Sequence, residues 1–152
     1  MKYGPIEILL ASMFASVLTG CTISTPVMRA GSYQGLANTE PSKGTVFVYR
    51  NSAFAGSVNQ YDVMINGALA GSLPNGSFFN VDVEPGETKV EPRTLTAFGF
   101  GKGSTIVVEK GNSYCFRLTL NFCVQCKSAD IDAVDSKQCE DEISGLEKVQ
   151  LK

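Results

Sequence analysis

Short stretches in which apolar and polar residues alternate dominate most of the chain. In "SFFNVDV" (77–83), Phe79, Val81 and Val83 alternate with polar neighbours. A period of two is typical of a β-strand with one buried face. The run "GTVFVYR" (44–50) is rich in β-branched and aromatic residues, which favour strands. Both segments are therefore predicted to be β-strands.

Turn signals separate these strands. In "YDVMINGALAGSL" (61–73), alternate residues of "YDVMI" share one face, and Asn66-Gly67 supplies the pair with positive φ that a tight hairpin needs. Pro85 and Gly86 in "EPGE" occupy the positions that a type II turn requires. The chain is thus predicted to run through consecutive short strands joined by tight turns.

Further strands are predicted at 87–98, 104–109, 114–122 and 146–151. The acidic segment between the last two (128–144) indicates a short helix or an acidic loop. About seven short strands with regularly spaced turns favour an all-β fold, and within a single domain over residues 44–152 an antiparallel β-sandwich is expected.

The apolar stretch Ile8–Val17 has the length of the hydrophobic region of a signal peptide. It is followed by "LTGC", which resembles the bacterial lipobox. The resemblance implies a signal peptide at 1–20, cleavage between Gly20 and Cys21, and a diacylglycerol thioether on the Cys21 thiol. An ordinary secretory signal with an incidental Cys, or a buried N-terminal helix, is the alternative. A doubly or triply acylated Cys21 would be a durable membrane anchor.

Residues 21–43 contain Pro and Gly without a sustained period, and they are predicted to form the lipidated N-terminus and a flexible tether. Thr22, rather than Asp, follows Cys21. By analogy with enterobacterial lipoproteins, this favours sorting to the outer membrane. We expect the domain to be anchored there and to face the periplasm, with the cell exterior as the alternative.

Composition narrows the functional classes. The 152 residues carry a net charge of −2, without the basic patch that nucleic-acid binding requires. The chain has no His, the commonest general base and metal ligand. We therefore expect neither an enzyme nor a cofactor.

Several motifs resemble a family of small bacterial lipoproteins known as domain of unknown function 2846. They are a strand ending in Tyr-Arg, an Asn-Gly hairpin, a "G-x-L-x-N-G-x-F" stretch and a Pro-Gly-Glu turn. These motifs lie at Tyr49, Arg50, Asn66, Gly67, Gly71, Leu73, Asn75, Gly76, Phe78, Pro85, Gly86 and Glu87. The hairpin followed by Pro-Gly is also similar to PEGA-type modules. The resemblance implies a β-sandwich and an envelope location, and it implies no activity.

Apart from Cys21, four cysteines remain: Cys115, Cys123, Cys126 and Cys139. An even number in an exported domain predicts disulfides. Cys115 and Cys123 lie about 26 Å apart along an extended strand and cannot pair unless it turns back. We expect Cys139 to pair with Cys123 or Cys126, and Cys115 with the other.

Three short motifs resemble redox, metal-binding or phosphate-binding sites. "CVQC" (123–126) is a Cys-x-x-Cys motif, which leaves open a thiol-disulfide redox protein, or zinc held by four Cys. "GFGKGST" (99–105) resembles a phosphate loop, but Gly103 interrupts the Lys-Ser/Thr step, so a flexible hairpin tip is expected. "DIDAVD" (130–135) spaces carboxylates like a calcium loop but lacks its Gly, so a solvated acidic loop is expected.

Phe54, Phe98 and Phe100 lie in Gly-containing segments between predicted strands. They either cap the core, which we expect, or form an exposed apolar contact patch. The sequence as a whole predicts a lipid-anchored binding or structural domain, whose loops engage an envelope protein or cell-wall glycan. A redox protein using Cys123 and Cys126 is the alternative.

Overall fold

The computed structural model describes residues 29–93, 101–122 and 127–151. Within these ranges the chain forms ten strands and one helix. They are β1 (Arg29–Ser32), β2 (Gly44–Arg50), β3 (Tyr61–Ile65), β4 (Ala68–Leu73), β5 (Ser77–Val83), β6 (Gly86–Pro92), β7 (Ser104–Val108), β8 (Ser113–Phe122), β9 (Lys127–Val134), α1 (Ser136–Ile143) and β10 (Glu147–Val149).

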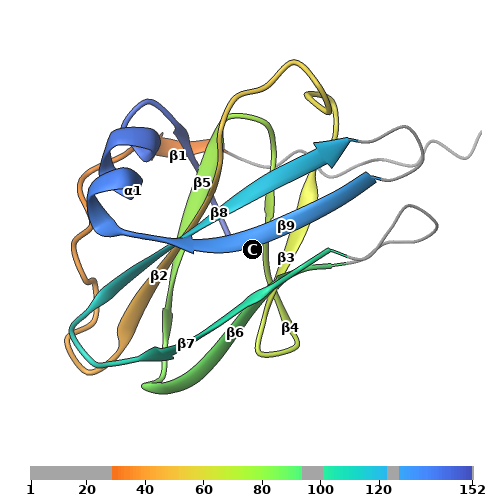
Figure 1. The fold of residues 1–152 in the computed structure, drawn as a ribbon. Coiled ribbons are helices and arrows are strands. Elements are labelled where there is room, and N and C mark those ends of the chain that lie inside the picture. The colour runs from red at the N-terminus through yellow and green to blue at the C-terminus, as the bar shows by residue number, and fades with distance from the viewer. Residues whose placement is uncertain (1–28, 94–100, 123–126, 152) are drawn as a thin grey trace, which may run out of the picture.

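The strands form two sheets that pack against each other (Figure 1). The larger has six strands in the order β1-β10-β5-β2-β8-β9, and the smaller has four in the order β4-β3-β6-β7. The sheets meet along one side, where Ser104 Oγ donates to the carbonyl of Ile131 (2.9 Å) on β9. The predicted all-β sandwich is confirmed.

The prediction of purely antiparallel strands is wrong for two pairs. β2 pairs with β8 in parallel, and β10 pairs with β5 in parallel. Between β2 and β8 the chain forms β3 and β4 of the smaller sheet, returns to the larger sheet as β5, and then forms β6 and β7 of the smaller sheet. A connection of that length does not force neighbouring strands to run in opposite directions, as a two-residue hairpin does.

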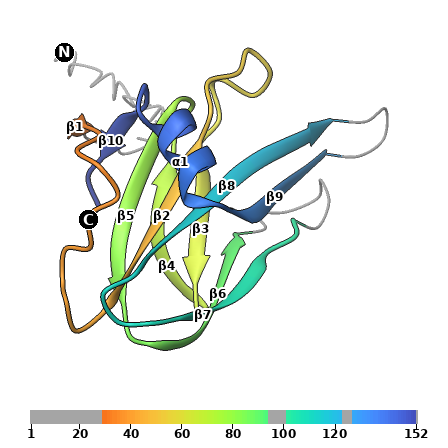
Figure 2. The ribbon, with the colours of Figure 1, turned by 60° about the vertical axis from the view of Figure 1, so that its left-hand side comes forward.

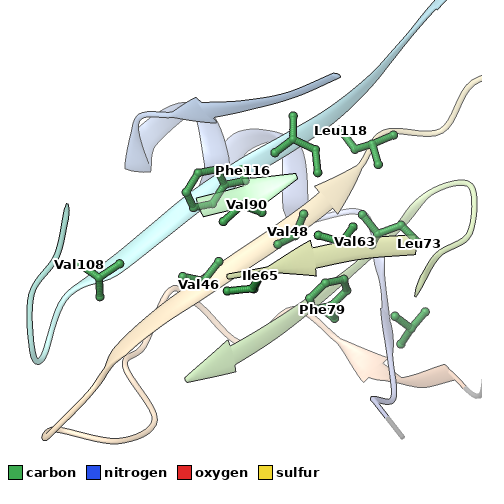
Figure 3. Packing of buried hydrophobic residues seen from close by; sticks show 12 residues of the cluster. Val46, Val48, Val63, Ile65, Leu73, Phe79, Val90, Val108, Phe116 and Leu118 are labelled. Carbon is green, nitrogen blue, oxygen red and sulfur yellow. The ribbon is translucent and has the colours of Figure 1, made fainter. Parts of the chain in front are cut away.

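The main core lies between the two sheets (Figure 3). Its residues are aliphatic except for two phenylalanines, and all are at most 8% exposed. They are Val46, Val48, Val63, Ile65, Leu73, Phe79, Val90, Val108, Phe116, Leu118, Ile131 and Val149.

A second core lies on the outer face of the larger sheet, beneath α1 (Figure 2). Phe47 and Tyr49 of β2 point into it, whereas Val46 and Val48 point into the main core. All seven residues of β2 are consequently buried. Cys139 and Ile143 of α1, together with other buried residues, complete this second core.

The strands with clear alternation were predicted with their observed bounds. β2 and β5 begin and end as expected, and the β3–β4 hairpin turns at Asn66-Gly67. These two residues have φ values of 51° and 79°, the left-handed conformation that the sequence signalled. Strong local patterns therefore sufficed in this part of the chain.

The expected helix or acidic loop at 128–144 is in fact a strand followed by a helix. β9 pairs with β8 along its whole length, from Lys127 opposite Phe122 to Val134 opposite Cys115. Ile131 faces the core while Asp130 and Asp132 lie on the other face. The segment alternates with a period of two, but its acidic residues made it resemble a loop. Charged residues are common on edge strands such as β9. Only the helical part of the prediction, α1, is confirmed.

Part of the predicted tether belongs to the folded unit. β1 pairs with β10, and the Tyr33 ring packs edge-on against Phe78 at 6.0 Å. Asn38 Nδ2 donates to the carbonyl of Lys43 (3.0 Å) and to Thr45 Oγ1 (3.1 Å). Residues 29–43, which were predicted to be part of the tether, therefore contact the sandwich, and the rest of the predicted tether lies outside the described residues.

A disulfide joins Cys115 to Cys139 (S–S 2.00 Å). The expected pairing of Cys139 with Cys123 or Cys126 is therefore wrong. Because β9 returns antiparallel to β8, it delivers α1 next to the start of β8, and Cys139 on the buried face of α1 reaches Cys115. Cys115 and Cys139 are 4% and 0% exposed.

This pairing can be read from a non-reduced tryptic digest. We expect peptide 111–117 to be linked to peptide 138–148, because cleavage after Arg117 and Lys137 separates the two cysteines. Replacing both Cys115 and Cys139 by Ala should lower the free energy of unfolding by about 3 kcal/mol, from loop-closure entropy. Urea denaturation measures this loss. A link from either peptide to 118–127 would contradict the assignment.

Candidate functional site: the loop end of the sandwich

β2, β4, β6 and β8 all end at the same end of the sandwich. β2 ends at Arg50, and β8, which runs parallel to it, ends at Phe122 on the same side. β5 begins there at Ser77, opposite Arg50. We call this side the loop end. Its longest described connection is the 51–60 loop, between β2 and β3.

The 51–60 loop, "NSAFAGSVNQ", contains no charged residue and exposes two large apolar side chains. Phe54 is 99% exposed and Val58 is 92% exposed. The expectation that Phe54 caps the core is therefore wrong, and the alternative of an exposed apolar residue holds for it. Phe98 and Phe100 lie outside the described residues.

The guanidinium of Arg50 is hydrogen-bonded to the backbone of this loop. Arg50 is 2% exposed, and its Nη1 and Nη2 donate to the carbonyls of Asn59 and Gly56, each at 2.8 Å. The same group lies 4.9 Å from the centre of the Tyr61 ring, a cation–π contact. Burial lowers the pKa of Arg50, but an Arg side chain remains charged in proteins. Two backbone carbonyls and the face of an aromatic ring thus stabilise the buried charge of Arg50.

The beginning of the loop is held by the turn that precedes β5. The amide of Ala53 donates to Asn75 Oδ1 (3.0 Å). Gly76 has a φ of +68°, and a Cβ at this position would lie 2.3 Å from Ser52 Oγ. The positive φ therefore favours glycine at this turn, against which Ser52 packs closely. Fixed at both ends, the loop presents Phe54 and Val58 on an ordered backbone.

The first test of this arrangement is Arg50→Lys. A single ammonium cannot donate to both carbonyls with the geometry of a guanidinium fork, so one buried carbonyl loses its partner. We expect the free energy of unfolding to fall by about 1–3 kcal/mol. The exposed Arg93→Lys is the matched control and should leave stability nearly unchanged. Equal small effects in urea denaturation would contradict the role given to Arg50.

A second polar cluster lies where α1 crosses the larger sheet. The Glu142 carboxylate accepts hydrogen bonds from Tyr49 Oη (3.0 Å), Asn51 Nδ2 (2.7 Å), Arg117 Nη1 (3.0 Å) and Gln138 Nε2 (2.7 Å). Four donors occupy both oxygens. The cluster therefore fastens α1 to β2 and β8, and it has no carboxylate oxygen left for a substrate or metal.

The surroundings also fix the protonation states of this cluster. Burial alone would raise the pKa of Glu142, but the hydrogen bonds from Gln138, Asn51 and Tyr49 and the charge of Arg117 outweigh it, so the pKa is lowered. Burial, then the hydrogen bond to Glu142, raise the pKa of Tyr49. The pair thus persists as a carboxylate and a neutral phenol, a stable structural pairing.

The lowered pKa of Glu142 makes stability depend on pH. The contribution is complete above the unfolded-state pKa, about 4.3, and is lost as the pH falls through the lower pKa of the folded carboxyl. Glu142→Gln should lower the free energy of unfolding by about 1–3 kcal/mol at pH 7 and weaken its decline between pH 5 and 3. The exposed Asp141→Asn on the same helix is the control. An unchanged acid limb would refute this account.

The acidic segment 130–135 does not form a calcium loop. Asp130 accepts from the Lys102 amide (2.9 Å) and from Asn121 Nδ2 (2.6 Å). The Asp135 carboxylate accepts from the Gln138 amide (2.9 Å) and caps α1. Each carboxylate has a protein partner, and among the described residues no group of three or more Cys, Asp or Glu is placed to hold a metal ion.

Those contacts also bear on the predicted flexible tip at 99–105. Its described part is tied to β9, because the Ile131 amide donates to the Lys102 carbonyl (2.7 Å). A phosphate at Lys102 would meet the Asp130 carboxylate, which already accepts the Lys102 amide. The negative charge of Asp130 therefore also argues against a phosphate loop here. Residues 99–100 lie outside the described part.

The disulfide excludes zinc bound by four Cys, because Cys115 and Cys139 are oxidised to each other. The residues proposed for signal cleavage and lipidation, Gly20 and Cys21, lie outside the described residues, as do Cys123 and Cys126. No helix in the described part of the chain is long and apolar enough to span a bilayer.

Sequence reasoning did not identify Arg50 or Glu142 as organising residues. Arg50 was noted only as the end of a strand motif, and its partners are backbone carbonyls, which leave no trace in a sequence. Glu142 was one of several acids in a polar segment. A single charge at the end of an otherwise apolar strand was the signal available for Arg50.

Comparison with known proteins places these features in a family. A family model described as "Protein of unknown function (DUF2846)" matches residues 40–129. The chain belongs to this family. Searches of curated proteins and of solved structures found no match.

The DUF2846 match covers β2 to β8 and includes the 51–60 loop with its supports. Arg50, Asn75 and Gly76, three of the positions that carried the resemblance, are the residues that hold this loop. α1, β10 and Cys139 lie beyond the matched range. The loop end therefore belongs to the part of the chain shared with DUF2846, whereas the disulfide partner on α1 does not.

Proposed function

We propose that the protein is a lipid-anchored component of the bacterial envelope, held in the outer membrane through Cys21, with a non-catalytic binding domain facing the periplasm. The observation that carries the proposal is the lipobox-like "LTGC" after an apolar run of signal-peptide length. The buried Cys115–Cys139 disulfide supports it, because such bonds persist in oxidising compartments such as the periplasm.

The loop end supports a binding role. Binding residues are often carried on loops that a rigid scaffold positions, and the 51–60 loop is held in this way. The carboxylate of Glu142, whose pKa is lowered, accepts hydrogen bonds only from protein side chains. This arrangement gives Glu142 a structural role. We propose that the loop end contacts a component of the envelope in which the protein is anchored.

The anchor can be tested by the intact mass of protein extracted from membranes, alkylated with and without reduction. We expect residues 1–20 to be absent, Cys21 to carry a diacylglycerol thioether and N-acylation, and Cys21→Ser to move the protein from the membrane to the soluble fraction. Ser57→Ala is a control that should remain in the membrane. An unmodified Cys21 in protein that stays soluble would refute the anchor.

The same samples test the redox alternative. With Cys115 and Cys139 paired, the thiols that remain besides Cys21 are those of Cys123 and Cys126. If neither reacts with the alkylating agent before reduction, the binding role is supported. Two reactive thiols mapping to peptide 118–127 would favour a thiol-disulfide protein instead.

A further inference from the structure

The 51–60 loop combines three properties. It is uncharged, its two large apolar side chains are almost fully exposed, and its backbone is fixed by a buried cation. Figure 2 shows the loop projecting beyond the strand ends, between β2 and β3. Exposure of Phe54 and Val58 to water is unfavourable, and neither side chain contributes to the cores.

Part of the backbone of the loop is hydrogen-bonded within the protein. The carbonyls of Gly56 and Asn59 already accept from Arg50, and the amides of Ser57 and Asn59 donate to the carbonyls of Phe54 (3.3 Å) and Gly56 (3.0 Å). Polar groups that are paired within the protein lose little when they leave water. This internal pairing lowers the cost of moving that part of the loop out of water.

The chain enters β1 at Arg29, opposite Val149, and β1 leads from there to Ser32, which lies nearer the loop end. Ser32 of β1 lies opposite Glu147, Glu147 opposite Ser77, and Ser77 opposite Arg50. These four residues form one row across the sheet. At the usual spacing of neighbouring strands, Ser32 and Arg50 are about 14 Å apart.

The connection from Cys21 to β1 is short enough to limit where the domain sits. Residues 22–28 separate Cys21 from Arg29, and an extended chain of this length spans at most about 30 Å. That reach covers the distance from β1 to the loop end. The lipid and the tip of the loop can therefore meet the same membrane surface.

We propose that the tip of the 51–60 loop, with Phe54 and Val58, inserts into the bilayer that holds the lipidated Cys21, so that the loop end faces the membrane. The proposal rests on the lipid anchor proposed above and identifies a partner for the loop end, the lipid surface itself. A fixed loop loses little conformational freedom on insertion, and two apolar side chains add to the contact made by the acyl chains.

The absence of Trp from the sequence makes a direct test possible. In the full lipidated chain, Phe54→Trp introduces a single indole at the tip, and Leu69→Trp introduces one at an exposed apolar position beside the 66–67 hairpin, at the opposite end of β3 and β4. Both proteins are reconstituted into phosphatidylethanolamine–phosphatidylglycerol vesicles with brominated or ordinary acyl chains. Bromine quenches an indole only within the acyl region.

We expect brominated vesicles to quench the emission of the Phe54→Trp protein, and its maximum to shift to shorter wavelength, with both effects absent in the Leu69→Trp protein. Phe54→Trp combined with Val58→Ser should lose part of the quenching, because one of the two inserting side chains is removed. Emission of the Phe54→Trp protein that is unaffected by bromine, in protein whose mass shows the lipid, would overturn the insertion while leaving the anchor intact.

Other outcomes are also decisive. A blue shift of the Phe54→Trp protein that appears only when envelope proteins are added, without quenching by bromine, would mean that the loop docks on a protein, and the proposal fails. If Cys21 proves unmodified, the anchor fails separately, and the same vesicles added to the soluble Phe54→Trp protein test the loop alone. Quenching would then support insertion, and its absence would overturn it.

Discussion

The burial of β2 on both faces is the constraint on which the rest of the structure depends. Val46 and Val48 face the smaller sheet, and Phe47 and Tyr49 face α1, so this one strand contributes to both cores. A shift of one residue in its register would exchange the two sets, forcing aromatic rings into the space that valines fill. Burial on both faces also requires a cover for the outer side, which α1 and residues 33–36 provide.

That cover is held by contacts that a hydrophobic face alone does not supply. The Cys115–Cys139 bond fixes α1 to β8, and Glu142 satisfies the hydroxyl of Tyr49, which would otherwise be a buried polar group without a partner. Both parts of this cover, α1 and residues 33–36, lie outside the range matched to DUF2846. The family-matched strands therefore form the sandwich, and the C-terminal segment completes the second core over β2.

The sequence predicted the elements that depend on local interactions and missed those that depend on contacts between distant segments. β2, β5 and the hairpin at Asn66-Gly67 have local patterns and were predicted with their bounds. β1 and the Cys115–Cys139 pair depend on partners distant in the sequence, and these partners were fixed by strand order rather than by local propensity. The loop end was foreseen only as a set of turns, because the backbone partners of Arg50 carry no sequence signal.

Arg50 links the core to the loop end. It is the last residue of β2, the strand that is buried on both faces. From this buried position its guanidinium donates to the carbonyls of Gly56 and Asn59. Placing a charge there is costly unless carbonyls meet it, and the 51–60 loop supplies them. The loop is therefore required to fold over Arg50, and this fold leaves Phe54 and Val58 on its outside. The exposed apolar tip is thus a consequence of the same strand that organises both cores, which explains how a small domain keeps such a surface ordered.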